Sequence, residues 1–330
     1  MSIATSPAPV LSVAETEALF GRMLDGEMSE AEITATLLGM GDRGENAEDI
    51  AGAVLAMRAR MIPVSAPAQA IDVCGTGGDG QHSLNVSTAV AIVVAACGVP
   101  VAKHGNRAAS SKAGGADTLE ALGLDLDRAS ERAEETLADL GLAFLFAQKH
   151  HPALARLAPI RKAIGKRTIF NLTGPLANPA SVTRQLVGVA NPIYVPIYRD
   201  AMALVGMTSA IVVGGEEGLD ELSIDGPSVV SALGFPDLAT QISPADAGLP
   251  SHSLEELRGG DAAYNAAALR RLLNGEPGAY RDAVLFNAAA ALILSGEAAD
   301  WRDGVEEAAE AIDKGLAKAL LDCWIATTNA

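Results

Sequence analysis

The 330-residue sequence predicts an α/β protein in two parts, a small helical domain over residues 1–68 and a larger α/β domain over residues 69–330 with a mostly parallel central sheet. The first part, through roughly residue 60, has apolar residues at helical spacing, and this pattern breaks in a short proline-containing segment at 63–67. Beyond that segment, strand and helix patterns alternate. Such alternation is typical of a parallel sheet covered by helices on its faces.

Two helix starts in the first part carry capping residues. Ser29 and Glu32 have the S-x-x-E spacing of a capping box, in which each side chain bonds the backbone N–H of the other residue. Asn46 is a favourable N-cap residue, and an apolar stripe that includes Ile50 and Val54 follows it. Both segments are therefore expected to be helices that pack one face inward.

The second part contains five short apolar segments of the kind that form buried strands. We expect strands at 71–74, 99–103, 143–146, 185–189 and 209–213. Helical patterns lie between most of them and continue after the last. We expect helices at 88–98, 129–141, 152–164, 193–206, 264–273, 279–295 and 301–322.

Charge and apolar patterning restrict the class of protein. The net charge is −17, from 41 acidic and 24 basic residues, and no basic stripe is present. A sequence-independent nucleic-acid binder needs such a stripe to displace counterions, so nucleic acid is disfavoured as a partner. The longest apolar run, 89–102, contains Gly98 and Pro100 and is too short to span a membrane.

Neither the N-terminus nor the cysteines indicate secretion. The first 13 residues lack a charged segment followed by an apolar core, so they do not form a secretory signal. Cys74, Cys97 and Cys323 share no metal-ligand spacing and cannot all pair with one another. Free thiols in a reducing compartment, and hence a cytoplasmic location, are expected.

The first of two polar loops, GTGGDGQHSLNVST at 75–88, joins a predicted strand to the predicted helix 88–98. Its glycines let the backbone approach an anion closely and adopt positive φ. Ser87 and Thr88 stand at the helix start, where free N–H groups and the helix dipole favour phosphate. Asn85 adds an amide, and the Ser87 hydroxyl can reach a magnesium ion. The alternative interpretation is a glycine-rich turn that closes on a capped helix.

Residues 75–80 also satisfy the G-x-G-x-x-G dinucleotide pattern. That pattern requires a helix that opens within the motif and an acidic residue at the end of the next strand, for the ribose hydroxyls. Here polar sequence continues through Thr88, and the next strand ends in Lys103 and His104. The nicotinamide-dinucleotide interpretation therefore fails on both counts.

The second polar loop, KHGNRAASSKAGG at 103–115, follows the next predicted strand and carries Lys103, Arg107 and Lys112. Both loops leave strand ends, so they can face one pocket suited to a heavily phosphorylated ligand. A third segment, GLDELS at 218–223, places Asp220 and Glu221 side by side after the strand at 209–213. Such carboxylates are often merely solvated, but beside a diphosphate site their oxygens suit magnesium.

Four motifs in this order and spacing resemble the anthranilate phosphoribosyltransferase family of tryptophan biosynthesis. They are GTGGDG with NVST, KHGNRAASS, FNLTGPLANPA at 170–180, and GLDELS. The resemblance extends from about residue 10 to 322. It implies transfer of phosphoribose from 5-phosphoribosyl 1-diphosphate to the amine of anthranilate, with Mg²⁺. It also implies a hinge between the two domains and homodimers that pair through the helical domain, which forms part of the cleft wall. It leaves a contact with anthranilate synthase open.

The resemblance also assigns roles, residue by residue. In the first loop, the residues expected to bind phosphoribosyl diphosphate are Gly75, Gly78, Asp79, Ser83, Asn85, Val86, Ser87 and Thr88. In and after the second loop they are Lys103, His104, Gly105, Asn106, Arg107, Ala108, Ala109, Ser110, Ser111 and Gly115. Those expected to hold anthranilate are Gly75, Asn106, His151 and Arg161, with Arg161 as the bidentate partner of the carboxylate. Those expected to hold magnesium are Ser87, Asp220 and Glu221.

Lys103 and His104 are the expected catalytic residues. Lys103 would stabilise the charge that grows on the departing diphosphate. His104 would orient anthranilate or accept the proton that its amine loses. None of the loop residues is a plausible covalent nucleophile, so direct displacement is expected.

Two positions depart from the family pattern. Gly115 stands where the family more often has Ser or Ala, which puts a side-chain contact there in doubt. His150 precedes His151 and Pro152 where Tyr-His-Pro is more usual, and we expect His150 to be exposed.

Three alternative functions remain at this point. A pyrimidine nucleoside phosphorylase would carry S-T-G-G-V-G-D and K-M-S-G-R loops, which this chain lacks. A non-catalytic nucleic-acid-binding paralogue would lose the carboxylate pair and gain basic surface. Transfer to another aromatic amine is the third.

Overall fold

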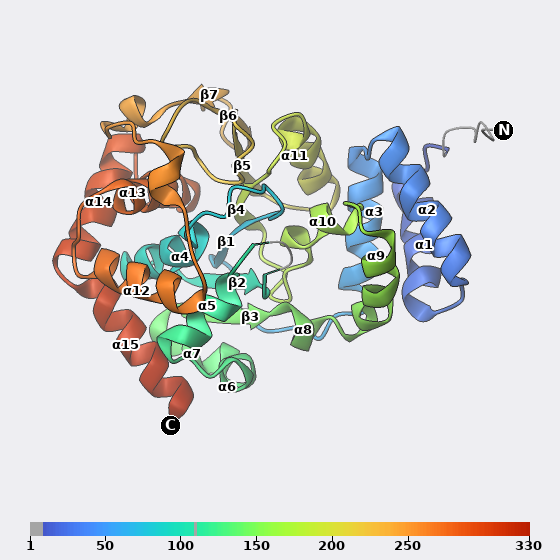
Figure 1. Ribbon diagram of the computed structural model, residues 1–330, viewed down its shortest axis with the longest axis horizontal. Coiled ribbons are helices and arrows are strands. Elements are labelled where there is room, and N and C mark those ends of the chain that lie inside the picture. Colours follow the sequence, from blue (N-terminus) through green and yellow to red (C-terminus); the bar gives the residue numbers. More distant parts are fainter. Residues whose placement is uncertain (1–8, 109–110) are drawn as a thin grey trace.

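The computed structural model describes residues 9–108 and 111–330 and confirms the predicted architecture, a small helical part beside a larger α/β part (Figure 1). The helical part begins with α1 (Val13–Asp25), α2 (Glu30–Arg43) and α3 (Ala47–Arg58). All three start with a capping box, which confirms the capping box predicted at Ser29 and the N-cap predicted at Asn46.

A single seven-stranded sheet forms the centre of the larger part. Its strands are β1 (Ile71–Gly75), β2 (Val101–Gly105), β3 (Leu142–Phe146), β4 (Arg184–Gly188), β5 (Ser209–Gly215), β6 (Ser228–Leu233) and β7 (Gln241–Ile242). Their spatial order is β3-β2-β1-β4-β5-β6-β7. The first five are parallel, and all five lie within two residues of their predicted positions. The antiparallel strands β6 and β7 were not predicted from the sequence.

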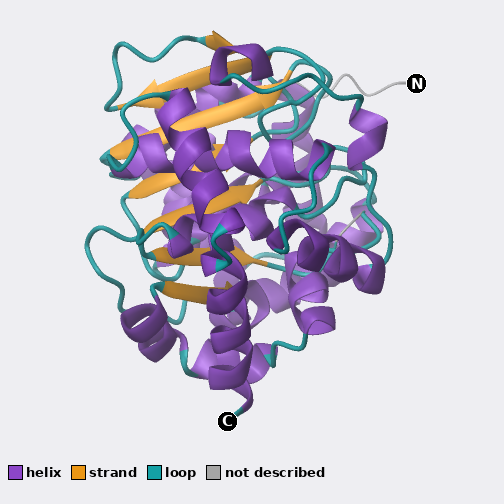
Figure 2. Ribbon diagram, turned by 90° about the vertical axis from the view of Figure 1, so that its left-hand side faces the viewer, coloured by secondary structure: helices purple, strands orange, loops and turns teal. Residues whose placement is uncertain are grey.

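Helices cover both faces of the sheet, because successive strand side chains alternate between the faces. One face packs on the helices α4 (Val86–Ala96), α12 (Ala262–Leu273), α13 (Ala279–Ser295), α14 (Trp301–Asp313) and α15 (Leu316–Asn329). Figure 2 shows several of these helices crossing in front of the stacked strands. The other face packs on α1–α3 and α11 (Tyr194–Leu204), and at the β3 edge on α7 (Ala133–Leu140). Within the described residues, no helix combines the length and apolar character that a bilayer crossing requires.

Short helices make up the connections. They are α5 (Gly115–Leu122), α6 (Leu126–Glu131), α8 (Ala147–His150), η1 (Pro152–Leu157), α9 (Ala158–Ile164), α10 (Phe170–Thr173), η2 (Pro175–Ala177), η3 (Pro244–Ala247) and η4 (Leu254–Leu257). Three predicted helices are wrong as single units. The helix predicted at 129–141 is interrupted at Arg132, and the one at 152–164 divides into the 3-10 helix η1 and α9. The one at 301–322 is divided at Gly315, whose φ of 73° ends the helical path.

The helical part also includes residues from the middle of the chain. Leu157, Ile160 and Phe170 share one apolar core with Phe20 and Ile50. The rings of Phe20 and Phe170 meet edge to face with centroids 5.6 Å apart. The segment from α8 to η2 therefore packs on the N-terminal helices, which periodicity within residues 1–68 could not reveal.

Candidate active site

The candidate site lies where the strand order reverses. In the order β3-β2-β1-β4-β5, β2 and β3 lie on one side of the β1–β4 pair and β5 on the other, so the strand order reverses at this pair. In parallel sheets, ligands bind at such a reversal, outside the carboxyl ends of the strands. Gly75, Gly105 and Gly188 end three of these strands. A cavity of about 370 Å³ opens there, and Met57 of α3 and Leu154 of η1 close its opposite wall.

Every predicted site residue that the structure describes lines this one cleft. They are Gly75, Gly78, Asp79, Ser83, Asn85, Val86, Ser87, Thr88, Lys103, His104, Gly105, Asn106, Arg107, Ala108, Ser111, Gly115, His151, Arg161, Asp220 and Glu221. Ala109 and Ser110 lie outside the described residues. Segment 170–175 also lines the cleft; its FNLTGP motif was visible in the sequence, but its position was not. Met57 had no distinguishing signal, because an apolar residue on a helix resembles any core residue.

The first loop approaches the cleft through backbone conformations that favour glycine. Gly77, Gly78 and Gly80 have φ between 67° and 76°, as expected for a loop that turns its N–H groups toward an anion. His82 has φ of 53° without being glycine. Helix α4 then begins, and its N-cap residue Asn85 makes no side-chain cap bond. In the first turn, Val86 N–H donates to the Leu84 carbonyl at 2.7 Å and Ser87 N–H donates to Glu221 Oε1 at 3.1 Å, so both groups are engaged within the protein.

The Asn85 side chain is engaged within the protein. Its Oδ1 accepts bonds from Thr118 Oγ1 and from Asn265 Nδ2, the latter at 2.9 Å. Its Nδ2 donates to the Ala113 carbonyl at 3.2 Å. The Tyr280 hydroxyl donates to the Asn85 backbone carbonyl at 3.1 Å. Asn85 therefore ties the first loop to α5, α12 and α13.

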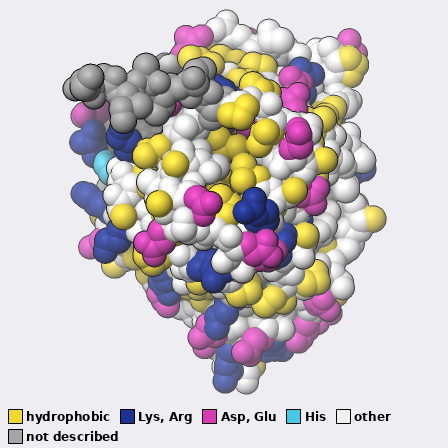
Figure 3. Space-filling model, turned by 90° about the vertical axis from the view of Figure 1, so that its right-hand side faces the viewer, with side chains coloured by type: hydrophobic (Ala, Val, Ile, Leu, Met, Phe, Trp, Pro, Cys, Tyr) yellow, Lys and Arg dark blue, Asp and Glu magenta, His cyan; other side chains and the backbone are white. Residues whose placement is uncertain are grey.

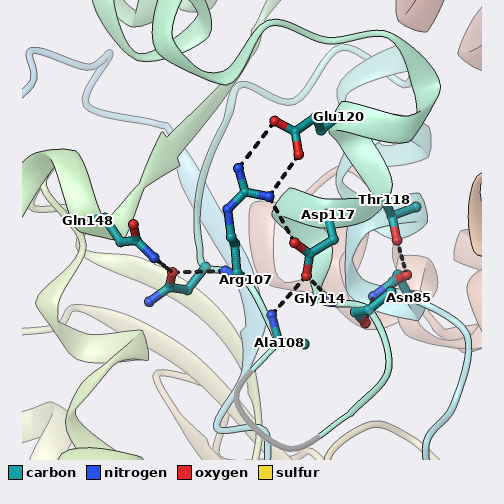
Figure 4. A network of polar contacts seen from close by, with 10 residues as sticks. Asn85, Arg107, Ala108, Gly114, Asp117, Thr118, Glu120 and Gln148 are labelled. Atoms are coloured by element: carbon teal, nitrogen blue, oxygen red, sulfur yellow. Dashed lines mark hydrogen bonds and ion pairs between the residues drawn. The ribbon is translucent and has the colours of Figure 1, made fainter. Parts of the chain in front are cut away.

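Arg107 is likewise held by protein groups (Figure 4). Its guanidinium pairs with Asp117 at 2.9 Å and with Glu120 at 2.8 Å. Asp117 also accepts the backbone N–H groups of Ala108 and Gly114, both at 2.9 Å. Hydrogen bonds that Arg107 donates to Glu120 and Asp117 raise the pKa of Arg107, which keeps it charged. The Arg107 charge is therefore already paired with two carboxylates in this structure.

Lys103 supplies the buried positive charge of the cleft. Its Nζ donates to the Val73 carbonyl at 2.6 Å and to Ser87 Oγ at 3.2 Å. Burial raises the pKa of Asp72 and of Glu221, and the Lys103 charge opposes both shifts. Asp72 is fully buried and accepts bonds from His104 N, Asn178 and Gln185. Lys103 thus lies between a structural carboxylate and the predicted metal-binding one.

The carboxylate pair reaches the cleft because two strand-end glycines leave room for it. A Cβ at Gly188 would lie 1.7 Å from the Asp220 carbonyl oxygen, and one at Gly75 would lie 2.2 Å from Asp220 Oδ2. Gly77 N–H donates to Asp220 Oδ2 at 2.6 Å, and Ser87 N–H donates to Glu221 Oε1 at 3.1 Å. The two carboxylates therefore join the first loop to the start of α4.

The electrostatics of the carboxylates suit a bound cation. Burial, followed by repulsion from Asp79, raises the pKa of Asp220 to about 7. Burial, followed by repulsion from Asp220, raises the pKa of Glu221 well above its usual range. Asp79 Oδ2 is buried without a hydrogen-bond partner. Among the described residues no three His, Cys, Asp or Glu side chains form a complete metal cage. A pair of buried carboxylates suits Mg²⁺, which takes one or two carboxylates and completes its shell with water and phosphate oxygens.

Two neutral histidines face each other at the other end of the cleft. The rings of His104 and His151 have centroids 5.2 Å apart. Burial, followed by the charge of His151, lowers the pKa of His104 to about 3, and burial lowers that of His151 to about 4. His104 Nδ1 lies 3.0 Å from the Gly174 carbonyl, which can only accept. The proton is therefore on Nδ1, and the unpartnered Nε2 carries a lone pair.

Arg161 forms the cationic part of the far wall. Its guanidinium lies over the Phe170 ring, 5.4 Å from the centroid, and burial lowers its pKa. Asn106 also lines the cleft, and its Oδ1 accepts the backbone N–H of Arg107 at 2.8 Å. A planar acceptor with a carboxylate would fit between a half-buried arginine and the two histidines.

The two departures from the family pattern have distinct structural outcomes. A Cβ at Gly115 would lie 2.8 Å from Thr88 Oγ1, so glycine there lets α5 pack close to the start of α4. His150 is buried, contrary to the prediction that it is exposed, and its Nδ1 lies 3.0 Å from the Ile62 carbonyl. It joins α8 to the segment between the two parts of the molecule.

Comparisons with known proteins agree with this geometry. The family model "Glycosyl transferase family, a/b domain" matches residues 67–318, and "Glycosyl transferase family, helical bundle domain" matches residues 7–61. The anthranilate phosphoribosyltransferase of Novosphingobium aromaticivorans is 65% identical over 327 residues, 99% of each chain. The crystal structure of the enzyme of that name from Thermus thermophilus is 41% identical with a TM-score of 0.93, over 98% of this chain and 97% of that one. The Saccharomyces cerevisiae enzyme in complex with PRPP and Mg is 29% identical with a TM-score of 0.88, over 97% and 94%.

Proposed function

The chain belongs to the anthranilate phosphoribosyltransferases of the glycosyl transferase family, and on that premise we propose that it transfers the 5-phosphoribosyl group from 5-phosphoribosyl 1-diphosphate to the amine of anthranilate. The products are N-(5-phosphoribosyl)anthranilate and diphosphate, and the reaction is the second step of tryptophan biosynthesis from chorismate. One observation carries the proposal: an anion-binding loop, a carboxylate pair and an arginine wall line a single cleft.

The donor would bind at the sheet edge. The left-handed glycines of the first loop let its backbone approach the phosphates closely, beside the start of α4. Lys103 adds the buried charge that stabilises the leaving diphosphate. Because Arg107 is already paired with two carboxylates, we assign it to loop structure in this protein and not to direct donor binding.

Mg²⁺ is the cofactor we assign to Asp220, Glu221 and Ser87. When bound, it supplies positive charge to the diphosphate oxygens. The chain's part is to hold two carboxylates at a buried position, with Asp79 beside them. A bound cation relieves the repulsion among these acidic groups, and this favours its uptake.

The acceptor would bind between Arg161 and the two histidines. Arg161 can pair with the acceptor carboxylate through two parallel N–H groups. The amine lone pair forms the new C–N bond while the anomeric C–O bond breaks and diphosphate leaves with the bonding electrons. The amine then loses one proton, and the free Nε2 of His104 can accept it. His104 is neutral, so it is ready for this role at neutral pH.

The test is a coupled pair of assays with purified protein, Mg²⁺ and phosphoribosyl diphosphate. Loss of anthranilate fluorescence and release of diphosphate should occur in equal amounts. Aniline, which lacks the carboxylate, should react far more slowly if Arg161 selects the acceptor. Absence of turnover at high enzyme concentration, or phosphorolysis of thymidine without the diphosphate donor, would contradict the assignment.

We also propose that the protein acts in the cytoplasm as a homodimer that pairs through its helical part. Figure 3 shows hydrophobic side chains gathered on the end of the molecule that carries these helices. Val10, at the start of this part, is 65% exposed. Light scattering should give twice the chain mass of 33.7 kDa, and a charged substitution such as Leu38→Glu on α2 should reduce it to the mass of a single chain.

A further inference from the structure

A single amide interrupts the apolar helix α13. Asn287 is fully buried, and its neighbours Phe286 and Ala288 are fully buried as well. Such a group lowers stability unless its donors and acceptor are hydrogen bonded. The helix lies on the face of the sheet away from the N-terminal helices (Figure 1). Its middle therefore has no contact with water to satisfy an amide.

All the hydrogen-bonding atoms of the Asn287 side chain have partners. Oδ1 accepts the backbone N–H of Leu222 at 2.9 Å. Nδ2 donates to the Leu222 carbonyl at 3.3 Å and to the Ala283 carbonyl at 2.9 Å. The amide thus pairs with both backbone groups of one residue, as a neighbouring strand would. Leu222 lies between β5 and β6, outside the strand ladder, so no strand provides this pairing.

Leu222 directly follows the two carboxylates. On the sheet side of this segment, the Asp220 carbonyl packs against Gly188, where even a methyl group has no room. After the segment, Ser223 N–H donates to the Ser228 hydroxyl at 2.8 Å. The backbone that carries Asp220 and Glu221 is therefore held by the sheet on one side and by Asn287 on the other.

We propose that Asn287 is a positioning residue that aims the carboxylates of Asp220 and Glu221 at the metal site. It acts through the Leu222 backbone and touches neither substrate nor metal. Two adjacent carboxylates repel each other, so an unsupported loop would relax by turning one of them away. Outer partners of metal ligands commonly change metal affinity by about 10–100-fold when removed. The inference rests on the proposed metal role of this pair.

The test compares Asn287→Ala with Leu292→Ala. Leu292 is fully buried on the same helix, and its side chain has no bond to the carboxylate segment. Mn²⁺ binding is measured by electron paramagnetic resonance in the presence of phosphoribosyl diphosphate and without acceptor, and the Mg²⁺ activation constant is measured separately. N287A should weaken metal binding by about 10-fold or more. L292A should lower Tm by a similar amount and keep the wild-type metal affinity.

A second variant covers the possibility that N287A does not fold. In Asn287→Ser the hydroxyl can bond the preceding turn of its own helix, but it cannot pair with both groups of Leu222. The same loss of metal affinity in N287S supports the proposal. If N287A or N287S binds the metal as tightly as L292A does, the proposal is overturned in favour of a purely structural role. Failure of both Asn287 variants to fold overturns it in the same way. Wild-type Mn²⁺ binding without turnover of anthranilate would refute the proposed function and leave this inference standing.

Discussion

Replacing Gly188 with alanine should disable the carboxylate pair without altering either carboxylate. The added Cβ would lie 1.7 Å from the Asp220 carbonyl oxygen, and ordinary contact begins at 3.4 Å. The opposing atom belongs to the backbone, so a rotamer change cannot relieve the clash. The segment must therefore retreat by roughly 1.7 Å, and a misplacement of about 1 Å at a reacting centre can lower the rate about 10²-fold.

The matched control is Gly226→Ala. It lies farther along the same segment, its φ is outside the left-handed region, and a Cβ there meets nothing within 4 Å. Overpacking of about 1–3 kcal/mol in G188A corresponds to a Tm decrease of roughly 2–12 °C for a domain of this size. G188A should lower kcat about 100-fold and raise the Mg²⁺ requirement, whereas G226A should leave both unchanged. A G188A enzyme with wild-type kcat and Mg²⁺ dependence would refute the close-packing argument.

Three further predictions follow from charges in the cleft. Lys103→Met should reduce kcat/KM for the donor far more than Arg107→Ala. The reason is that Arg107 is bonded to two carboxylates, whereas Lys103 has no directly bonded carboxylate. Equal losses in the two variants would contradict this. Burial lowers the pKa of His104 to about 3 and that of His151 to about 4. In the unfolded chain both histidines bind protons below the ordinary pKa of 6.5, whereas in the folded protein they stay neutral there. The free energy of unfolding should therefore fall from pH 7 to pH 5 by denaturant titration, and the fall should be smaller in His104→Gln. Because burial raises the pKa of Asp220 to about 7 from 3.8, its stabilising protonation is lost as the pH rises through 7. D220N should therefore raise Tm at pH 8 in EDTA while abolishing Mg²⁺-dependent turnover; a lower Tm would contradict the argument.

Local sequence patterns predicted the elements whose causes are local. The capping box at Ser29 and the cap at Asn46 appear as predicted, because capping involves residues three positions apart. The five parallel strands were also predicted, since each is a short apolar run. The antiparallel strands β6 and β7 were missed, because β6 is only half-buried and β7 has two residues. The division of the last helix depends on a single glycine conformation at Gly315.

The sequence by itself predicted which chemistry the protein carries: an anion-binding loop, a lysine at the end of a buried strand, a carboxylate pair and, through the family resemblance, an arginine for a carboxylated acceptor. Only the tertiary structure decided how these groups are used. It showed that Arg107 and Asn85 are bonded to protein groups, that His150 is buried, and that Asn287 contacts the carboxylate segment from 65 positions away. Motifs record which side chains are present. Whether a side chain faces the ligand or another part of the chain depends on contacts between distant segments, and those exist only once the sheet and its helices have packed.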